Sequence, residues 1–147
     1  MKKSNAAIMI ICILIIILFV YAATTKLLDY YNFHFGLTES PFIAPIAGIL
    51  AWAVPASELL ITGMLLIPAL RLMGLYASFV LMASFTVYIA AMLLSGSDIP
   101  CSCGGILENM SWNAHIVFNS AFVVLSGYGI YLQRKKRRTS ANLPALA

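Results

Sequence analysis

Two cysteines that lie one residue apart, Cys101 and Cys103, have the residue type and spacing for thiol chemistry. They stand in "DIPCSCGGILENMSW", residues 98–112, which is one of the few polar stretches of a very apolar chain. A disulfide between them needs a bent backbone, because fully extended residues two apart place their Cα atoms near the upper limit of the roughly 4.4–6.8 Å that a disulfide tolerates. Pro100 before the pair and two glycines after it favour such a bend.

A disulfide of this kind is poorly suited to be a structural crosslink. A strained, exposed disulfide has a higher reduction potential and tends to be labile or catalytic, and a ring this small removes little entropy from the unfolded chain. Redox exchange is therefore the favoured interpretation of Cys101 and Cys103. Two alternatives stay open, namely a soft-metal site for Cu(I) or zinc and an inert pair. Cys12 lies among isoleucines, where we expect a small buried apolar side chain.

The sequence that follows the cysteines contains Trp112, His115 and Asn119. Their spacing of three and four residues places them on one face of a predicted helix. Only the thiolate reacts, and a neighbouring imidazole or cation promotes its formation. We expect His115 to take a proton from Cys101 or Cys103. The alternative is that His115 only forms a hydrogen bond to a neighbouring helix.

Lys26 and Glu58 are two further candidates for supporting roles. Lys26 ends the first apolar stretch, where it can stabilise a thiolate electrostatically, or form a surface ion pair with Asp29 three residues further on. Glu58 lies inside the second apolar stretch. An acid near mid-bilayer costs on the order of 2.5–3.5 kcal/mol on insertion scales, so Glu58 needs compensation.

Polar groups near Glu58 can supply that compensation. Pro55 frees the carbonyl of Ala51 in the same helix, and neighbouring apolar stretches offer Ser78, Ser84 and Ser126 at comparable depth. Glu58 then either links helices through hydrogen bonds or lines a path for protons or a quinone.

The chain as a whole has the composition of a membrane protein. It has 147 residues, of which 62% are hydrophobic and 10% charged, against roughly 45–50% and 25% in soluble domains. Four apolar stretches reach the length of about 20 residues that a membrane-spanning helix needs. They lie near 6–25, 45–67, 72–94 and 112–132. We therefore predict an all-α membrane protein with four transmembrane helices in one domain, residues 1–138.

The connecting segments complete this predicted architecture. The aromatic segment that follows the first span is expected to form a helix at the membrane interface. Residues 139–147 are expected to be a disordered tail. The first span is expected to be an uncleaved anchor, and cleavage after Ala22, as in a signal peptide, is the alternative.

The positive charges predict the orientation of the spans. Eight of the nine lysines and arginines lie before the first span, between the second and third, or after the fourth. The positive-inside rule places these segments, and therefore both termini, in the cytoplasm. Cys101 and Cys103 then face the outside, where disulfides persist.

Several segments carry a resemblance to a known family. They are, in chain order, "YAATTKLLDYYNF", "SPFIAP", "WAVPASELL", "GLYASFVLMASFTVYI", "PCSCGG" and "SWNAHIVFN". The chain resembles the MauE/DoxX family of redox-associated membrane proteins. The resemblance implies a four-helix bundle in the bacterial inner membrane and a redox role for Cys101 and Cys103. It also implies a thioredoxin-like periplasmic partner, such as the one that acts with MauE in methylamine utilisation.

Residues and resemblance together predict a membrane thiol-disulfide oxidoreductase. It is expected to pass reducing equivalents between periplasmic thiols and the membrane, with a quinone as the candidate cofactor and no nucleic acid as partner. DoxX-like relatives without the cysteine pair show that the scaffold alone does not fix the chemistry. The alternative function is a soft-metal-binding or structural membrane subunit of a larger redox complex.

Overall fold

The computed structural model describes residues 2–95 and 112–141, and every regular element in these ranges is a helix. The elements are α1 (Lys2–Leu28), α2 (Tyr30–Thr38), the 3-10 turn η1 (Ala44–Ile46), α3 (Ala47–Leu66), α4 (Arg71–Leu94) and α5 (Trp112–Ala141). Four helical segments of the described chain are long and apolar enough to cross a membrane. They are Ser4–Leu28, Ala44–Leu66, Arg71–Leu94 and Asn113–Ser140. The predicted all-α fold with four membrane spans is confirmed.

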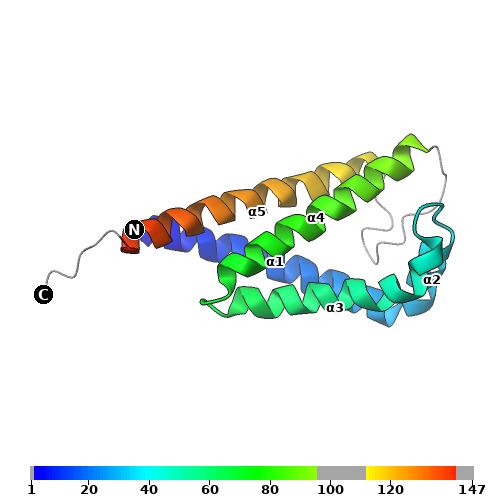
Figure 1. Ribbon diagram of the computed structural model, residues 1–147, viewed down its shortest axis with the longest axis horizontal. Helices are drawn as coiled ribbons and strands as arrows, with labels where there is room; N and C mark the ends of the chain where they lie inside the picture. Colours follow the sequence, from blue (N-terminus) through cyan, green and yellow to red (C-terminus); the bar gives the residue numbers. More distant parts are fainter. Residues whose placement is uncertain (1, 96–111, 142–147) are drawn as a thin grey trace, which may run out of the picture.

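The four long helices run alternately up and down and form a closed ring. Helix α1 contacts α3 and α5, and α4 contacts the same two helices from the other side (Figure 1). A tight turn joins α3 to α4, and within it the Leu70 N–H donates to the Ile67 carbonyl at 3.0 Å. The short α2 packs beside the beginning of α3. We call this end of the bundle the α2 end.

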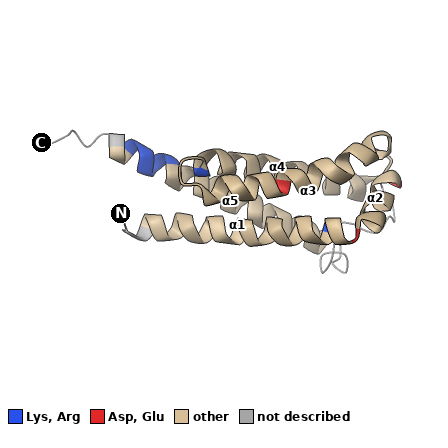
Figure 2. Cartoon of the chain, turned by 90° about the horizontal axis from the view of Figure 1, so that it is seen from below, with Lys and Arg blue, Asp and Glu red and all other residues tan. Residues whose placement is uncertain are grey.

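Positive charge gathers at the opposite end, which we call the basic end (Figure 2). Arg71 begins α4 there, and its Nε donates to the Leu65 carbonyl at 3.3 Å. The Arg137 guanidinium, on the last turns of α5, donates to the Ala69 carbonyl at 3.2 Å. The Leu65 carbonyl is one of the last of α3, where a nearby cation is favourable for the helix dipole and satisfies a free acceptor.

Buried side chains recur every three or four residues along the helices, as expected where one face of a helix packs inward. On α1 they are Ile8, Ile11, Cys12, Ile15, Phe19, Ala22, Ala23 and Lys26. On α3 they are Ala47, Ala51, Pro55, Glu58, Ile61, Thr62 and Leu65. The expected burial of Cys12 is confirmed. Two charged residues, Lys26 and Glu58, continue these otherwise largely apolar buried faces.

Helices α3 and α4 are in close contact at the basic end and move apart toward the α2 end (Figure 1). At Gly74 a Cβ atom would stand 3.0 Å from Leu65 Cδ2 and 3.2 Å from the Leu65 backbone nitrogen. A glycine therefore permits the tight crossing. Beyond this crossing the two helices diverge, and side chains of both line a cavity that also contacts Glu58.

The helix boundaries differ from the predicted ones in two places. Helix α1 continues to Leu28, and the expected interfacial helix is a separate element, α2, that begins after Asp29. Helix α5 continues through the basic run to Ala141. Residues 139–141, which were expected to belong to the tail, are therefore part of α5, and the Thr139 hydroxyl donates to the Lys135 carbonyl at 3.0 Å.

Candidate functional site

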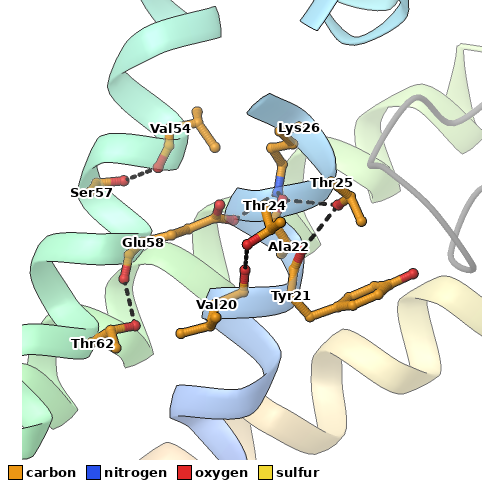
Figure 3. A network of polar contacts seen from close by, with 10 residues as sticks. All are labelled: Val20, Tyr21, Ala22, Thr24, Thr25, Lys26, Val54, Ser57, Glu58 and Thr62. Atoms are coloured by element: carbon orange, nitrogen blue, oxygen red, sulfur yellow. Dashed lines mark hydrogen bonds and ion pairs between the residues drawn. The ribbon is translucent and has the colours of Figure 1, made fainter. Parts of the chain in front are cut away.

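A buried ion pair joins α1 to α3. Lys26 Nζ lies 2.8 Å from Glu58 Oε1, and the two side chains are only 5% and 1% exposed (Figure 3). Lys26 Nζ also donates to the Ala22 carbonyl at 3.3 Å. Lys26 lies near the end of α1 and Glu58 about 16 Å into α3. The antiparallel α3 therefore begins beyond the end of α1, and this axial offset brings the two residues to the same level.

The surface ion pair between Lys26 and Asp29, one of the two alternatives for Lys26, does not form. Asp29 is exposed and accepts a hydrogen bond from Asn32 Nδ2 at 3.0 Å. Lys26 is on the buried face of α1, where the carboxylate of Glu58 provides the stronger interaction in a medium of low dielectric constant. The ammonium group of Lys26 is therefore paired with the carboxylate of Glu58.

The serines expected to compensate Glu58 do not do so. Ser78 and Ser84 each donate to the carbonyl four residues earlier in α4, at 2.8 Å. This local bond is a common choice of serine within a helix. Ser126 Oγ is buried and has no hydrogen-bond partner among the described residues. The compensation comes from Lys26.

The surroundings of the ion pair are aromatic and leave one polar atom unsatisfied. The rings of Phe33 and Phe85 have their centroids 5.8 Å from Lys26 Nζ, within cation–π range. The second carboxylate oxygen of Glu58, Oε2, is buried and has no hydrogen-bond partner in the part of the chain that the structure describes. A buried acceptor of this kind is unfavourable by about 1–3 kcal/mol unless a donor reaches it.

A cavity of about 260 Å³ lies next to the ion pair. All five helices contribute to its walls, which are mostly apolar. Its polar lining consists of Lys26, Glu58, Ser84, Tyr88, His115 and Asn119. Four of these six residues were predicted as site residues from the sequence, and the structure brings them to one cavity.

His115 and Asn119 reach the cavity from the first turns of α5. Their side chains are 2% and 4% exposed, so the predicted shared face of these two residues is confirmed as a buried face. The side chain of Trp112 lies outside the described residues. Cys101 and Cys103 also lie outside them, between the end of α4 and the beginning of α5 in the sequence.

Sequence reasoning missed the aromatic residues of the site. Phe33 of α2 and Phe85 of α4 contact the ammonium group, and Tyr88 lines the cavity. The sequence pattern does not single out these aromatic residues as part of a site, because aromatic residues are common at membrane interfaces. His34 of α2 does not line the cavity and stacks on Tyr30 with ring centroids 5.8 Å apart.

A cluster of conventional metal ligands is not found within residues 2–95 and 112–141, where no three His, Cys, Asp or Glu side chains converge. The polar groups around the cavity are instead an ion pair, an imidazole and an amide. They can donate and accept hydrogen bonds and exchange protons in an apolar setting.

Fold and site together define a four-span helical membrane protein with a buried ion pair beside an internal cavity. The family model described as "Methylamine utilisation protein MauE" matches residues 4–132. The chain therefore belongs to the MauE family, which confirms the resemblance seen in the sequence. No curated protein and no solved structure matches it.

Proposed function

We propose that this MauE-family protein is a membrane thiol-disulfide oxidoreductase. Cys101 and Cys103 form a reversible disulfide on the outer side of a bacterial inner membrane and exchange it with a thioredoxin-like partner. The basic end of the bundle then faces the cytoplasm, in accordance with the positive-inside rule.

One observation carries this proposal. The segment with both cysteines is attached to α5, and the first turns of that helix place His115 and Asn119 beside the Lys26–Glu58 pair at one buried cavity. Charged groups in a membrane interior are unfavourable and are usually found where they have a function. A proton acceptor and an ion pair at the beginning of the helix that follows the cysteines in the sequence are groups that exchange chemistry needs.

The exchange proceeds through two attacks by thiolates. A partner thiolate attacks the Cys101–Cys103 disulfide, which forms a mixed disulfide and releases one thiolate of the pair. The partner's second thiolate then attacks the mixed disulfide, so the partner leaves as a disulfide while Cys101 and Cys103 remain as two thiols. The two protons of the partner thiols pass to the pair, and His115 is the group that we assign to this transfer. The reverse sequence reduces the partner.

Labelling of thiols from outside the cell tests the proposal. In spheroplasts, a membrane-impermeant maleimide should label Cys101 and Cys103 only after reduction, and mass spectrometry should detect the disulfide between them before reduction. Cys12 is a built-in control, because it is buried in α1 and should stay unlabelled. Protection that depends on added Cu(I) or zinc instead of an oxidant would favour the soft-metal alternative. Labelling only from the cytoplasmic side would contradict both the predicted orientation of the spans and the proposed relay, by which we mean thiol-disulfide exchange between Cys101, Cys103 and the periplasmic partner.

The role of His115 predicts a dependence of thiol reactivity on pH. A thiol with a pKa of about 8.5 is mostly protonated near pH 7, so loss of a neighbouring base should slow its alkylation there and matter little at high pH. We expect His115→Ala to slow alkylation of single-cysteine variants below about pH 8, with the curves converging above it. His34→Ala is the matched control. If the alkylation rate depends on pH in the same way in His115→Ala, in His34→Ala and in the protein with both histidines, His115 has no part in the proposed mechanism.

A further inference from the structure

We propose that the cavity beside the Lys26–Glu58 pair binds the head group of a membrane quinone and its quinol. This inference deepens the proposed function and rests on it for the electron donor, because it names the membrane partner of the cysteine pair. The binding site itself consists of described residues alone.

The size of the cavity suits one substituted ring. A cavity of about 150 Å³ lined by apolar side chains binds benzene and excludes water. The cavity here has about 260 Å³, which leaves room for the ring substituents but not for a long isoprenoid tail. The tail of a bound quinone must therefore leave the protein.

The wall of the cavity between α3 and α4 gives the tail a route. Leu50 and Val54 of α3 and Ser84 and Tyr88 of α4 line the cavity from these two helices. Ser84 is exposed on the outside of the bundle and therefore marks the rim of the cavity. Both helices are candidate membrane spans, so the rim opens toward lipid, where quinones are dissolved.

The polar groups match both redox forms of a quinone. A quinone presents two carbonyl acceptors, for which the ammonium of Lys26 and the amide of Asn119 are donors at the cavity. A quinol presents hydroxyl donors, for which the unsatisfied Oε2 of Glu58 is a buried acceptor. A lipid acyl chain fills an apolar cavity equally well, but it offers no donor to Glu58. The unsatisfied carboxylate oxygen therefore favours a quinol over an acyl chain.

The electrons and protons balance between the two sites. When Cys101 and Cys103 are oxidised to the disulfide, two S–H bonds are lost and one S–S bond forms. Two electrons and two protons then pass to the quinone, where two O–H bonds form. Lys26, Glu58 and His115 surround the ring site and provide groups that can hold these protons.

Direct binding to the purified full-length protein tests the site without relying on exchange activity. The probe is decylubiquinone, with a photoreactive azido derivative to map its contacts by mass spectrometry. We expect Ser84→Trp, which obstructs the rim, to weaken binding on the order of tenfold. Val87→Trp is the matched control, because Val87 is 69% exposed on the same helix and does not line the cavity. Crosslinks confined to the lipid-facing surface, or equal binding by both variants, would overturn the proposal.

The redox form of the probe gives a second, independent readout. Glu58→Gln replaces a carboxylate oxygen with an N–H donor, so it should weaken quinol binding relative to quinone binding, on the order of tenfold in the ratio. Ser126→Ala changes another buried polar group that does not line the cavity and should leave the ratio unchanged. An unchanged ratio in a folded Glu58→Gln protein would exclude Glu58 as the quinol acceptor and overturn the assignment.

Failure of the quinone site and failure of the relay are distinguishable. The variant with both Cys101→Ser and Cys103→Ser should bind decylubiquinone like the unmodified protein, because the cavity contains neither cysteine. Binding without any detectable cysteine disulfide would leave the quinone site standing and remove the relay. A reversible disulfide in a protein that binds no quinone would remove the quinone site alone.

Discussion

Replacing either Cys101 or Cys103 by serine is expected to abolish thiol-disulfide exchange. A single thiol can still attack a disulfide, but the mixed disulfide that forms has no second thiol to resolve it. The variant that keeps the attacking cysteine should therefore accumulate a covalent complex with its partner. Non-reducing electrophoresis of membranes from cells that express the variant should show this complex, and a reductant should release both proteins.

The third cysteine supplies the control for this experiment. Cys12→Ser changes a thiol that is buried in the apolar core, so the variant should exchange normally and trap no partner. Analysis of the released protein would identify the partner and show whether it is thioredoxin-like. Normal content of disulfides in exported proteins with both Cys101→Ser and Cys103→Ser would contradict the relay and favour the metal-binding or structural alternative.

Lys26→Met is expected to lower the free energy of unfolding by about 3 kcal/mol, because it leaves the carboxylate of Glu58 buried without its partner. Methionine retains most of the length of the lysine side chain, so the loss reports on the charge rather than on packing. Combining Lys26→Met with Glu58→Gln removes both charges and should recover more than half of the lost stability. Unfolding experiments in mixed bicelles would measure the free energy of unfolding of the two single variants and of the double variant. The coupling energy between the two positions follows from these values and that of the unmodified protein.

Two surface substitutions are matched controls for this cycle. Lys135→Met and Asp29→Asn remove charges that are exposed, so each should change the free energy of unfolding by less than about 0.5 kcal/mol. If the changes in the free energy of unfolding caused by Lys26→Met and Glu58→Gln add, there is no coupling energy between the two residues and the ion pair does not stabilise the protein. Glu58→Gln also separates the two roles first considered for Glu58. A stable variant that still exchanges disulfides but no longer couples them to quinone would assign Glu58 to the quinone site.

The sequence by itself determined the four long helices of this protein and the helix face that His115 and Asn119 share. Four apolar stretches of sufficient length must form helices in lipid, because every backbone N–H and C=O then finds its partner within the helix. The spacing of His115 and Asn119 predicts their shared face, and the structure buries that face. This works because helical periodicity is local and depends only on residues within a few turns.

Only the tertiary structure decided which groups meet. From the sequence, Asp29 was the nearest acid to Lys26, because local spacing relates only residues of one helix. Serines on neighbouring spans were the candidate partners of Glu58 because of their comparable depth alone. The Lys26–Glu58 pair joins residues 32 positions apart, on two antiparallel helices. Their meeting depends on the connection through α2 and on how far α3 slides along α1 as their apolar faces pack. No local pattern contains that axial alignment, and it is what places the ion pair, His115 and Asn119 around one cavity.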